Sequence, residues 1–197
     1  MVVCHIRKIV FVHIPKTGGT SIEQMMREGG KYQLYYLGVR NKRSMHHYMA
    51  KELKAELGRM FDVYRKFSFV RNPYDRIVSE YFWCPFGKRR NVGFDDFLNY
   101  VDGIIKSNNY FSNIYHDHFI PQYYFLFDDN NRLIIDYIFK FEDLEPAVEF
   151  IKSKFKINGN LPHLNKSMRE ELILTEEQKE KIYQMYKIDF DIFSYAK

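Results

Sequence analysis

The stretch KIVFVHIPKTGGTS, residues Lys8–Ser21, decides the fold class of this chain. Its apolar part is a run of β-branched and aromatic residues almost without alternation, which is typical of a strand buried in a parallel sheet. Pro15 ends the strand, and Gly18 and Gly19 allow the backbone to turn sharply and to approach a ligand closely. From Ser21 the apolar residues recur with helical spacing. Strand, turn and helix N-terminus together predict an α/β fold with an anion site, because free backbone N–H groups and the helix dipole favour negative charge there.

The polar side chains of this turn fit a phosphate-like ligand. Lys16 adds a positive charge, and Thr17, Thr20 and Ser21 add hydroxyl donors. The order differs from the standard nucleotide loop, in which the lysine follows the glycines and a hydroxyl residue follows the lysine. A lysine at the strand exit points towards the end of the anion from which a leaving group departs. The alternative is an ordinary strand–turn–helix connection with a surface lysine.

A second stretch, FSFVRNPYDRIVSEYFW, spans Phe67–Trp83. Its first four residues indicate another buried strand, and Arg71 follows at the carboxyl end, the edge at which open α/β sheets bind ligands. A helix follows, and Ser79 lies about two turns into it. A guanidinium and a hydroxyl so placed can hold one phosphate together. The alternative is that Arg71 pairs with Asp75 and Ser79 is a small packing residue.

The two stretches together resemble the PAPS-dependent sulfotransferases. HIPKTGGTS (His13–Ser21) is similar to their 5′-phosphosulfate-binding loop, and FVRNPYDRIVSEYFW (Phe69–Trp83) is similar to their 3′-phosphate-binding segment. The closest resemblance is to the carbohydrate sulfotransferases, the group of the heparan 2-O, chondroitin and dermatan enzymes and small bacterial relatives. Later segments resemble the same family in the expected order, so that the resemblance covers nearly the whole chain: KFEDL (Lys140–Leu144), LPHLNKS (Leu161–Ser167) and YKIDFDIFSY (Tyr186–Tyr195).

This resemblance implies an enzyme that moves the sulfuryl group of PAPS to a hydroxyl of an acceptor, expected to be a carbohydrate, and releases PAP. It implies no metal. Lys16 is expected to stabilise the leaving phosphate. The residues expected to bind the cofactor are Lys16, Thr17, Gly18, Gly19, Thr20, Ser21, Arg71, Ser79, Lys166 and Ser167.

Transfer to an alcohol also needs a base for the hydroxyl proton, and a histidine titrating near neutrality suits that role. The family carries a histidine in the segment that SMHHYMAKEL resembles, often as His-x-Thr-Ala before a helix. His47 gives the best register, although Met49 departs from the usual threonine. His47 is therefore the expected catalytic base, and His46 is the alternative.

The remaining histidines attract weaker interpretations. His116 and His118 lie two residues apart, a spacing that metal ligands can have. Without a third ligand, packing or surface positions are favoured for both. His13 is expected to pack at the strand end. His163, in the LPHLNKS segment, either lines the cofactor pocket or has an ordinary loop role.

Composition sets bounds on the chain. A length of 197 residues with 46% hydrophobic content fits one domain, residues 1–197, with a sizeable core. The net charge of +5 suits a polyanionic cofactor. No apolar run is long enough to span a membrane, and the N-terminus lacks a signal-peptide pattern. Two cysteines, Cys4 and Cys84, are too few for a disulfide framework or a zinc site, so a cytoplasmic location is expected.

The alternation of elements predicts a three-layer α/β fold with a mainly parallel central sheet flanked by helices. The resemblance makes this fold P-loop-NTPase-like. The expected strands are Ile6–Ile14, Phe67–Val70 and Leu133–Phe141, and Lys31–Ser44 is expected to form a loop with a short strand. The expected helices are Ser21–Glu28 closed by Gly29-Gly30, Met49–Leu57, Asp75–Trp83, Asp95–Ile105, Tyr110–Phe125, Pro146–Lys154, and a last helix that starts at a Thr175/Gln178 capping box.

Two other function classes compete with this one. In a nucleotide kinase or NTPase, Leu133–Asp136 would be the strand that ends in a magnesium-binding aspartate, but the loop lacks Gly-Lys-Ser/Thr and the apolar run continues past Asp136. A non-catalytic anion or nucleic-acid binder fits the basic charge and the aromatic content, but no nucleic-acid-binding motif is present. The basic segment Lys88–Arg90 is equally consistent with a solvated loop and with acceptor binding. Neither the acceptor nor the oligomeric state follows from the sequence.

Overall fold

The structure is a computed structural model that describes residues 2–28, 39–40, 43–162 and 172–197. Its centre is an open sheet of four strands in the order β1 (Val2–Cys4), β2 (Ile9–Val12), β5 (Arg65–Val70) and β6 (Tyr137–Lys140). Strands β2, β5 and β6 are parallel, and β1 pairs antiparallel with β2 at one edge. The prediction of a mainly parallel sheet in an α/β fold is confirmed.

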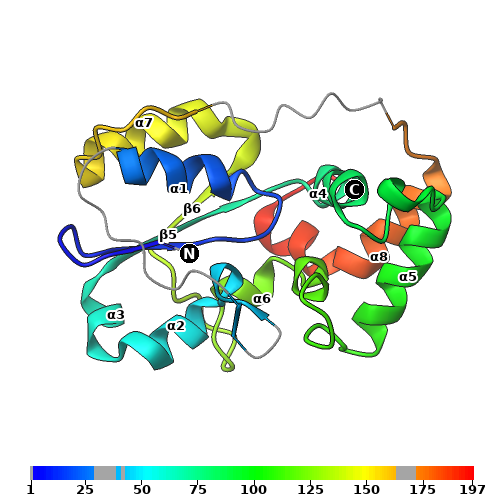
Figure 1. The fold of residues 1–197 in the computed structure, drawn as a ribbon, viewed down its shortest axis with the longest axis horizontal. Coiled ribbons are helices and arrows are strands. Elements are labelled where there is room, and N and C mark those ends of the chain that lie inside the picture. Colours follow the sequence, from blue (N-terminus) through cyan, green and yellow to red (C-terminus); the bar gives the residue numbers. More distant parts are fainter. Residues whose placement is uncertain (1, 29–38, 41–42, 163–171) are drawn as a thin grey trace.

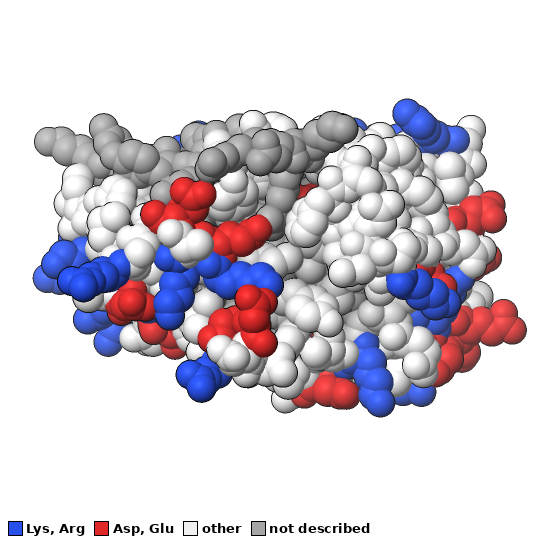
Figure 2. Space-filling model, turned by 90° about the horizontal axis from the view of Figure 1, so that it is seen from below, with Lys and Arg blue, Asp and Glu red and all other residues white. Residues whose placement is uncertain are grey.

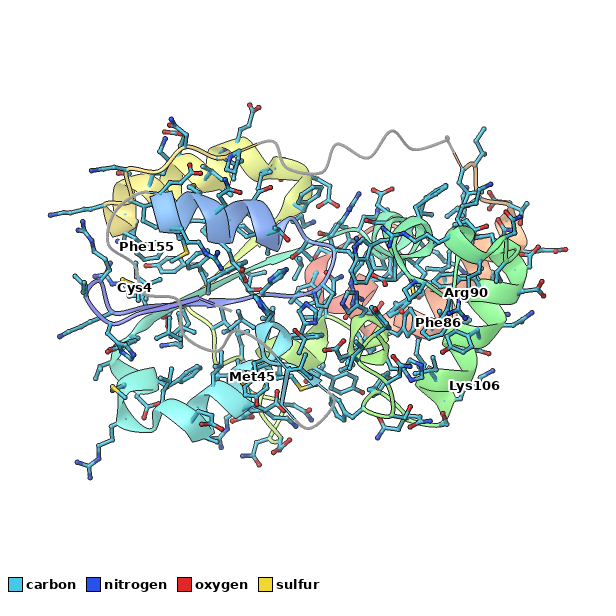
Figure 3. All side chains as sticks on the ribbon, in the orientation of Figure 1. Cys4, Met45, Phe86, Arg90, Lys106 and Phe155 are labelled. Carbon is cyan, nitrogen blue, oxygen red and sulfur yellow. The ribbon has the colours of Figure 1, made fainter. Side chains whose placement is uncertain are left out.

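Helices lie on both faces of this sheet (Figure 1). Alternate residues of β2 point to opposite faces, as strand geometry requires. Ile9 and Phe11 belong to the core under α1 (Gly19–Glu28) and α7 (Leu144–Phe155). Figure 3 labels two members of that core, Cys4 and Phe155.

The opposite face of the sheet belongs to a second and larger core. Val10 and Val12 of β2 pack there with apolar residues of α2 (Ala50–Leu57) and α3 (Arg59–Val63). The same core continues between three helices beyond the carboxyl ends of the strands: α4 (Pro73–Trp83), α5 (Phe94–Lys106) and α8 (Glu176–Phe193). Helix α8 starts as predicted, with a capping box in which Thr175 accepts from the Gln178 backbone N–H and the Gln178 side chain accepts from the Thr175 N–H.

The first strand is shorter than predicted. Residues 5–8 form a turn and not the start of a strand, so that Ile6 is exposed and β2 begins at Ile9. The turn closes through Lys8, which adopts the left-handed conformation with φ of 54°. The apolar run Val2–Cys4 is then free to pair back on β2 and to cover the edge of the sheet.

The predicted helix Tyr110–Phe125 is wrong. This segment contains a 3₁₀ turn, His116–Phe119, and one short helix, α6 (Tyr123–Leu126). Pro121 lacks a backbone N–H and disfavours helical conformation at the residue before it. Asn113 also accepts a hydrogen bond from the Tyr115 backbone N–H at 3.1 Å, a local turn that competes with a helix.

The third predicted strand and the first predicted helix exist, but their bounds differ from the prediction. The strand Leu133–Phe141 narrows to β6, since Leu133 forms only an isolated bridge with Phe127. Asp136, just before β6, accepts from the Lys66 backbone N–H at 2.7 Å. Helix α1 starts at Gly19 and not at Ser21.

Several predicted features lie outside the described residues: Gly29-Gly30, much of Lys31–Ser44, His163, Lys166 and Ser167. Within the described part of the Lys31–Ser44 segment, β3 (Val39–Arg40) pairs antiparallel with β4 (Arg43–Ser44). Cys4 and Cys84 are buried free thiols. Across the described ranges, every helix is too short or too polar to cross a membrane.

Candidate functional site

A cavity of about 840 Å³ lies at the carboxyl ends of β2 and β5, where both strands pass into helices. The β2–α1 turn forms one wall. The Gly18 carbonyl accepts from the backbone N–H groups of Ser21 and Ile22 at 3.1 and 3.3 Å and so begins α1. Of the predicted cofactor-binding residues, the lining includes Lys16, Gly18, Gly19, Thr20, Ser21 and Ser79.

Both glycines of this turn are packed so closely that a side chain would not fit. Gly18 has φ of +79°, and a Cβ there would lie 2.7 Å from Cε2 of Phe141. A Cβ on Gly19 would lie 2.1 Å from the ring of His13. The predicted need for glycine is therefore steric at both positions, and at Gly18 it is also conformational.

The side chains of the turn do not all face the cavity. Thr17 is fully buried, and its hydroxyl donates to the Ile14 carbonyl at 2.8 Å, so any contribution to an anion site would come from its backbone. Lys16 adopts φ of 67° and lies with Nζ 4.8 Å from the centroid of the Trp83 ring. A left-handed non-glycine residue is uncommon, and here it directs the lysine across the cavity towards α4.

The β5–α4 turn lies beside the first turn and is joined to it. Nη1 of Arg71 donates to the carbonyl of Lys16 at 3.2 Å, and its guanidinium lies 4.6 Å from the Phe141 ring. Asn72 caps α4 by accepting from the Tyr74 N–H at 2.9 Å. Ser79, on the same helix, lines the cavity, whereas Arg71 lies behind the lining and reaches it through Lys16 and Phe141.

Gln122 holds the backbone of Arg71 on both sides. Its Oε1 accepts from the Arg71 N–H and its Nε2 donates to the Arg71 carbonyl, both at 2.8 Å. Gln122 is itself fixed, because its backbone N–H donates to the buried Asp189 carboxylate at 2.8 Å. Burial raises the pKa of Asp189 to about 6 against the opposing effects of Arg76 and two backbone hydrogen bonds.

Four histidines line the cavity, and three of them form a buried row in which each pairs with a carboxylate through Nδ1. His13 pairs with Glu23 at 2.9 Å, His47 with Asp117 at 3.1 Å, and His118 with Glu80 at 2.9 Å. The rings pack edge to face, with centroids 5.4 Å apart between His13 and His47 and 4.7 Å apart between His47 and His118. The predicted base thus lies at the centre of a buried polar row.

His46, the alternative base, lies on the rim of the same row. Its Nδ1 is 3.6 Å from Glu23, and its side chain is 32% exposed, against 12% for that of His47. Both histidines line the cavity, in the 3₁₀ turn Met45–His47 whose first residue is labelled in Figure 3.

Burial determines the protonation of the row. Desolvation lowers the pKa of His47 well below its usual value of 6.5, and the neighbouring histidines lower it further. Desolvation also lowers the pKa of His13, against the raising effect of Glu23. Although burial raises the pKa of Glu23, hydrogen bonds from His13 and His46 outweigh it and lower the net value. His47 is therefore a neutral imidazole at neutral pH, as a base must be.

The same side chains are close enough to be considered as metal ligands. The ligand atoms of His47, Asp117 and His118 lie within 4.8 Å of one another, as do those of His13, Glu23 and His46. The sequence showed no third ligand beside His116 and His118. In the structure, His118 has two such neighbours, His47 and Asp117. Within both groups, the Nδ1 atoms of the histidines already contact carboxylates.

Besides Gln122 and the carboxylates of the histidine row, sequence reasoning missed Arg76 and Glu142. Arg76 is buried in α4 and donates to carbonyls on both sides of the cavity, those of Pro15 at 3.2 Å and His118 at 2.6 Å. Glu142 accepts from the Asn72 backbone N–H at 2.7 Å and from the Tyr195 hydroxyl at 3.0 Å. A charged residue on the apolar side of a predicted helix was the available signal for Arg76.

The residues of the basic segment Lys88–Arg90 have different surroundings in the structure. Arg89 lines the cavity. Arg90 lies with its guanidinium 5.6 Å from the Phe86 ring, and Figure 3 shows these two side chains close together. All three basic residues are exposed.

Comparison with known proteins assigns the family. Searches of curated proteins and of solved structures found no match to this chain. A family model described as the sulfotransferase family matches residues 1–196. Because that match covers nearly all of the 197 residues, the chain belongs to the sulfotransferase family, whose members are transferases of sulfuryl groups and generally use PAPS as the donor.

Proposed function

We propose that this protein transfers the sulfuryl group of PAPS to a hydroxyl of a carbohydrate acceptor. The observation that carries the proposal is the junction of the two turns. Arg71 donates to the Lys16 carbonyl at the edge of a cavity that also contains His47, so groups for both ends of the donor and a base for the acceptor share one place. The arrangement supports a P-loop-like fold in which the lysine precedes the glycines.

The donor set suits a polyanion with two phosphate groups. The β2–α1 turn offers backbone N–H groups at a helix N-terminus together with Lys16, Thr20 and Ser21. Arg71 and Ser79 would hold the 3′-phosphate. Lys166 and Ser167, which lie outside the described residues, stay predicted cofactor-binding residues.

Bound PAPS would supply the sulfuryl group and, as PAP, the leaving phosphate. Lys16 stabilises the negative charge that develops on the leaving oxygen. His47, with Nδ1 against Asp117, accepts the proton of the attacking hydroxyl at Nε2. Charge neutralisation by Lys16 and backbone amides makes binding independent of magnesium.

The test is transfer of ³⁵S from labelled PAPS to a panel of glycans and to cell extracts, followed by identification of the labelled product. We expect His47→Ala to lower turnover by roughly 10²–10⁴-fold, the usual contribution of a general base, while PAP affinity stays near that of the unchanged chain. Lys16→Ala should lower both turnover and PAP affinity, and Lys51→Ala, which removes an exposed amine paired with Asp129, is the matched control.

The result also decides between the two candidate bases. Full activity of His47→Ala would contradict the assignment of the base. Complete loss of activity in His46→Ala alone would move that role to His46. Calorimetry with equal affinities for PAP and AMP would contradict the placement of the 3′-phosphate at Arg71 and Ser79.

The described residues do not favour the other function classes. Asp136 would be the magnesium ligand if the protein were a kinase. It lies just before β6, at the amino ends of the parallel strands, and pairs with Lys66 at 3.1 Å, whereas Lys16 lies at the carboxyl ends. On the face shown in Figure 2, basic and acidic side chains are interspersed and do not form the single basic stripe expected for nucleic-acid binding.

A further inference from the structure

His118 is a second cavity-lining imidazole beside the proposed base. It lies in the 3₁₀ turn His116–Phe119, and its ring centroid is 4.7 Å from that of His47. His116, in the same turn, does not line the cavity, and both of its ring nitrogens are engaged, Nε2 with the Tyr100 hydroxyl at 2.7 Å and Nδ1 with the Ser112 hydroxyl at 3.0 Å. The two histidines therefore have different surroundings despite their adjacency in sequence.

Glu80 fixes the proton of His118 on one nitrogen. The carboxylate lies 2.9 Å from Nδ1, and both side chains are buried, at 7% and 2% exposure. An ionised carboxylate only accepts hydrogen bonds, so the neutral ring carries its proton on Nδ1 and presents an unprotonated Nε2. Asp117 imposes the same state on His47.

Nε2 of His118 is open to the cavity. Among the residues that the structure describes, none hydrogen bonds to this atom. The ring is held by stacking on Trp83 with centroids 4.6 Å apart and by the Nδ1 contact with Glu80, and the backbone of His118 is held by Arg76, which donates to its carbonyl at 2.6 Å. A fixed acceptor atom beside a base is preorganised for a ligand that donates a hydrogen bond.

We propose that His118 binds the acceptor directly, by accepting a hydrogen bond from a second hydroxyl next to the one that is sulfated. This inference rests on the proposed function and deepens it, since it names the acceptor as a compound with two neighbouring hydroxyls, as most sugars have. His47 takes the proton of the attacking hydroxyl, and His118 orients the acceptor. A simple alcohol with one hydroxyl would use only one of the two imidazoles.

The proton positions can be measured without an acceptor. Long-range ¹H–¹⁵N spectra of the full-length protein with ¹⁵N-labelled histidine distinguish the two neutral tautomers. We expect the proton of the neutral ring to lie on Nδ1 in both His47 and His118. Glu80→Gln, whose amide can donate to Nδ1, should change the state of His118 and leave His47 as it was. A proton on Nε2 of His118 in the unchanged protein would overturn the proposal.

Transfer of label to the glycan panel tests the contact with the acceptor. His118→Phe keeps a ring that can stack on Trp83 but removes the acceptor nitrogen. We expect this variant to raise the half-saturating acceptor concentration roughly tenfold, the equivalent of one hydrogen bond, while the affinity for PAP is unchanged. His118→Gln, which retains an acceptor oxygen, should recover part of the loss.

The control is His116→Gln, a substitution at the neighbouring histidine that does not line the cavity. Its thermal unfolding separates lost stability from lost binding, and its half-saturating acceptor concentration should equal that of the unchanged protein. An equal value for His118→Phe would contradict the proposal. If the unchanged protein transfers no label at all, the proposed function fails, while the tautomer spectra still decide whether His118 presents a free acceptor atom.

Discussion

The two turns that build the site, β2–α1 and β5–α4, are neighbours on the same sheet edge but are constructed in different ways. The β2–α1 turn depends mainly on its own conformation, with two glycines that leave no room for a Cβ and a lysine with φ of 67°, and Arg71 and Arg76 donate to its carbonyls. The β5–α4 turn depends on side chains from elsewhere, since Gln122 holds Arg71 and Glu142 holds Asn72. We therefore expect the first turn to be the more sensitive to changes of its own residues, and the second to depend also on residues far from it in the chain.

The largest expected effect is that of Gly19→Ala. The new methyl would lie 2.1 Å from the His13 ring, which is fixed by Glu23 and stacked on Phe11. We expect PAP binding to be lost and unfolding to become easier by about 1–3 kcal/mol, as for overpacked sites. Calorimetry and urea unfolding measure the two effects.

Gly103→Ala is the control for Gly19→Ala. Gly103 lies inside α5, and a Cβ there meets nothing within 4 Å. Alanine should therefore stabilise the protein by up to about 1 kcal/mol and leave PAP binding unchanged. Unchanged PAP affinity in Gly19→Ala would show that the backbone of the β2–α1 turn is not part of the site.

The next effect is that of Arg71→Ala on the preference for PAP over AMP. Removing one partner of a buried, charge-assisted pair typically costs ~2–5 kcal/mol, so most of that preference should disappear. AMP affinity itself should change little, because AMP lacks the 3′-phosphate. Arg65→Ala, at the other end of β5, is the control. A preference for PAP that survives in Arg71→Ala would place the 3′-phosphate elsewhere.

Gln122→Ala should have a smaller effect on the same quantity. It leaves the N–H and the carbonyl of Arg71 without their partner, at about 1–3 kcal/mol of stability for buried groups. We expect PAP affinity to fall by less than in Arg71→Ala, because the guanidinium is still present but less well placed. Gln122→Glu, which keeps the acceptor for the Arg71 N–H, should be intermediate. Equal PAP affinities in the unchanged protein, Gln122→Ala and Gln122→Glu would show that the β5–α4 turn does not need this support.

The smallest expected effect is the pH dependence of transfer. Lysine and arginine side chains stay charged near neutral pH, so the response to acidification is expected from His47 and, below its pKa of about 6, from Asp189 behind Gln122. Its pKa lies well below 6.5, so at saturating PAPS the rate should be flat down to pH 6.5 and fall only at lower pH, as the imidazole becomes protonated. A rate that halves near pH 6.5 would contradict the assignment of the base to the buried His47.

The depressed pKa of His47 also predicts how the free energy of unfolding changes with pH. Because the folded pKa of His47 is depressed, the unfolded chain binds a proton more readily, and the free energy of unfolding should decrease as pH falls below 6.5. His47→Gln should reduce that decrease, which urea unfolding at several pH values measures.

The sequence predicts the two turns well because their determinants are local. The strand, the glycines and the helix of the first turn all lie within Lys8–Ser21, and the order of Arg71, Asn72 and Ser79 defines the second. The side chains that support the site could not be predicted. Gln122 meets Arg71, and Asp117 meets His47, only in the tertiary fold. Their segment was interpreted as the helix Tyr110–Phe125, since its apolar residues fit a helical period that Pro121 and Asn113 override.

The hydrogen bonds around the cavity also have a kinetic consequence. His47 and Asp117 are 70 residues apart in the chain, Asn72 and Glu142 also 70, and Arg71 and Gln122 51. Contacts between such distant residues close large loops and tend to form late in folding. The pocket therefore exists only in the completed fold, and a ligand at a hundredfold excess over its dissociation constant would stabilise the whole chain by about 2.7 kcal/mol. Partly folded chains would not bind the donor, so a higher donor concentration would stabilise only the fully folded protein.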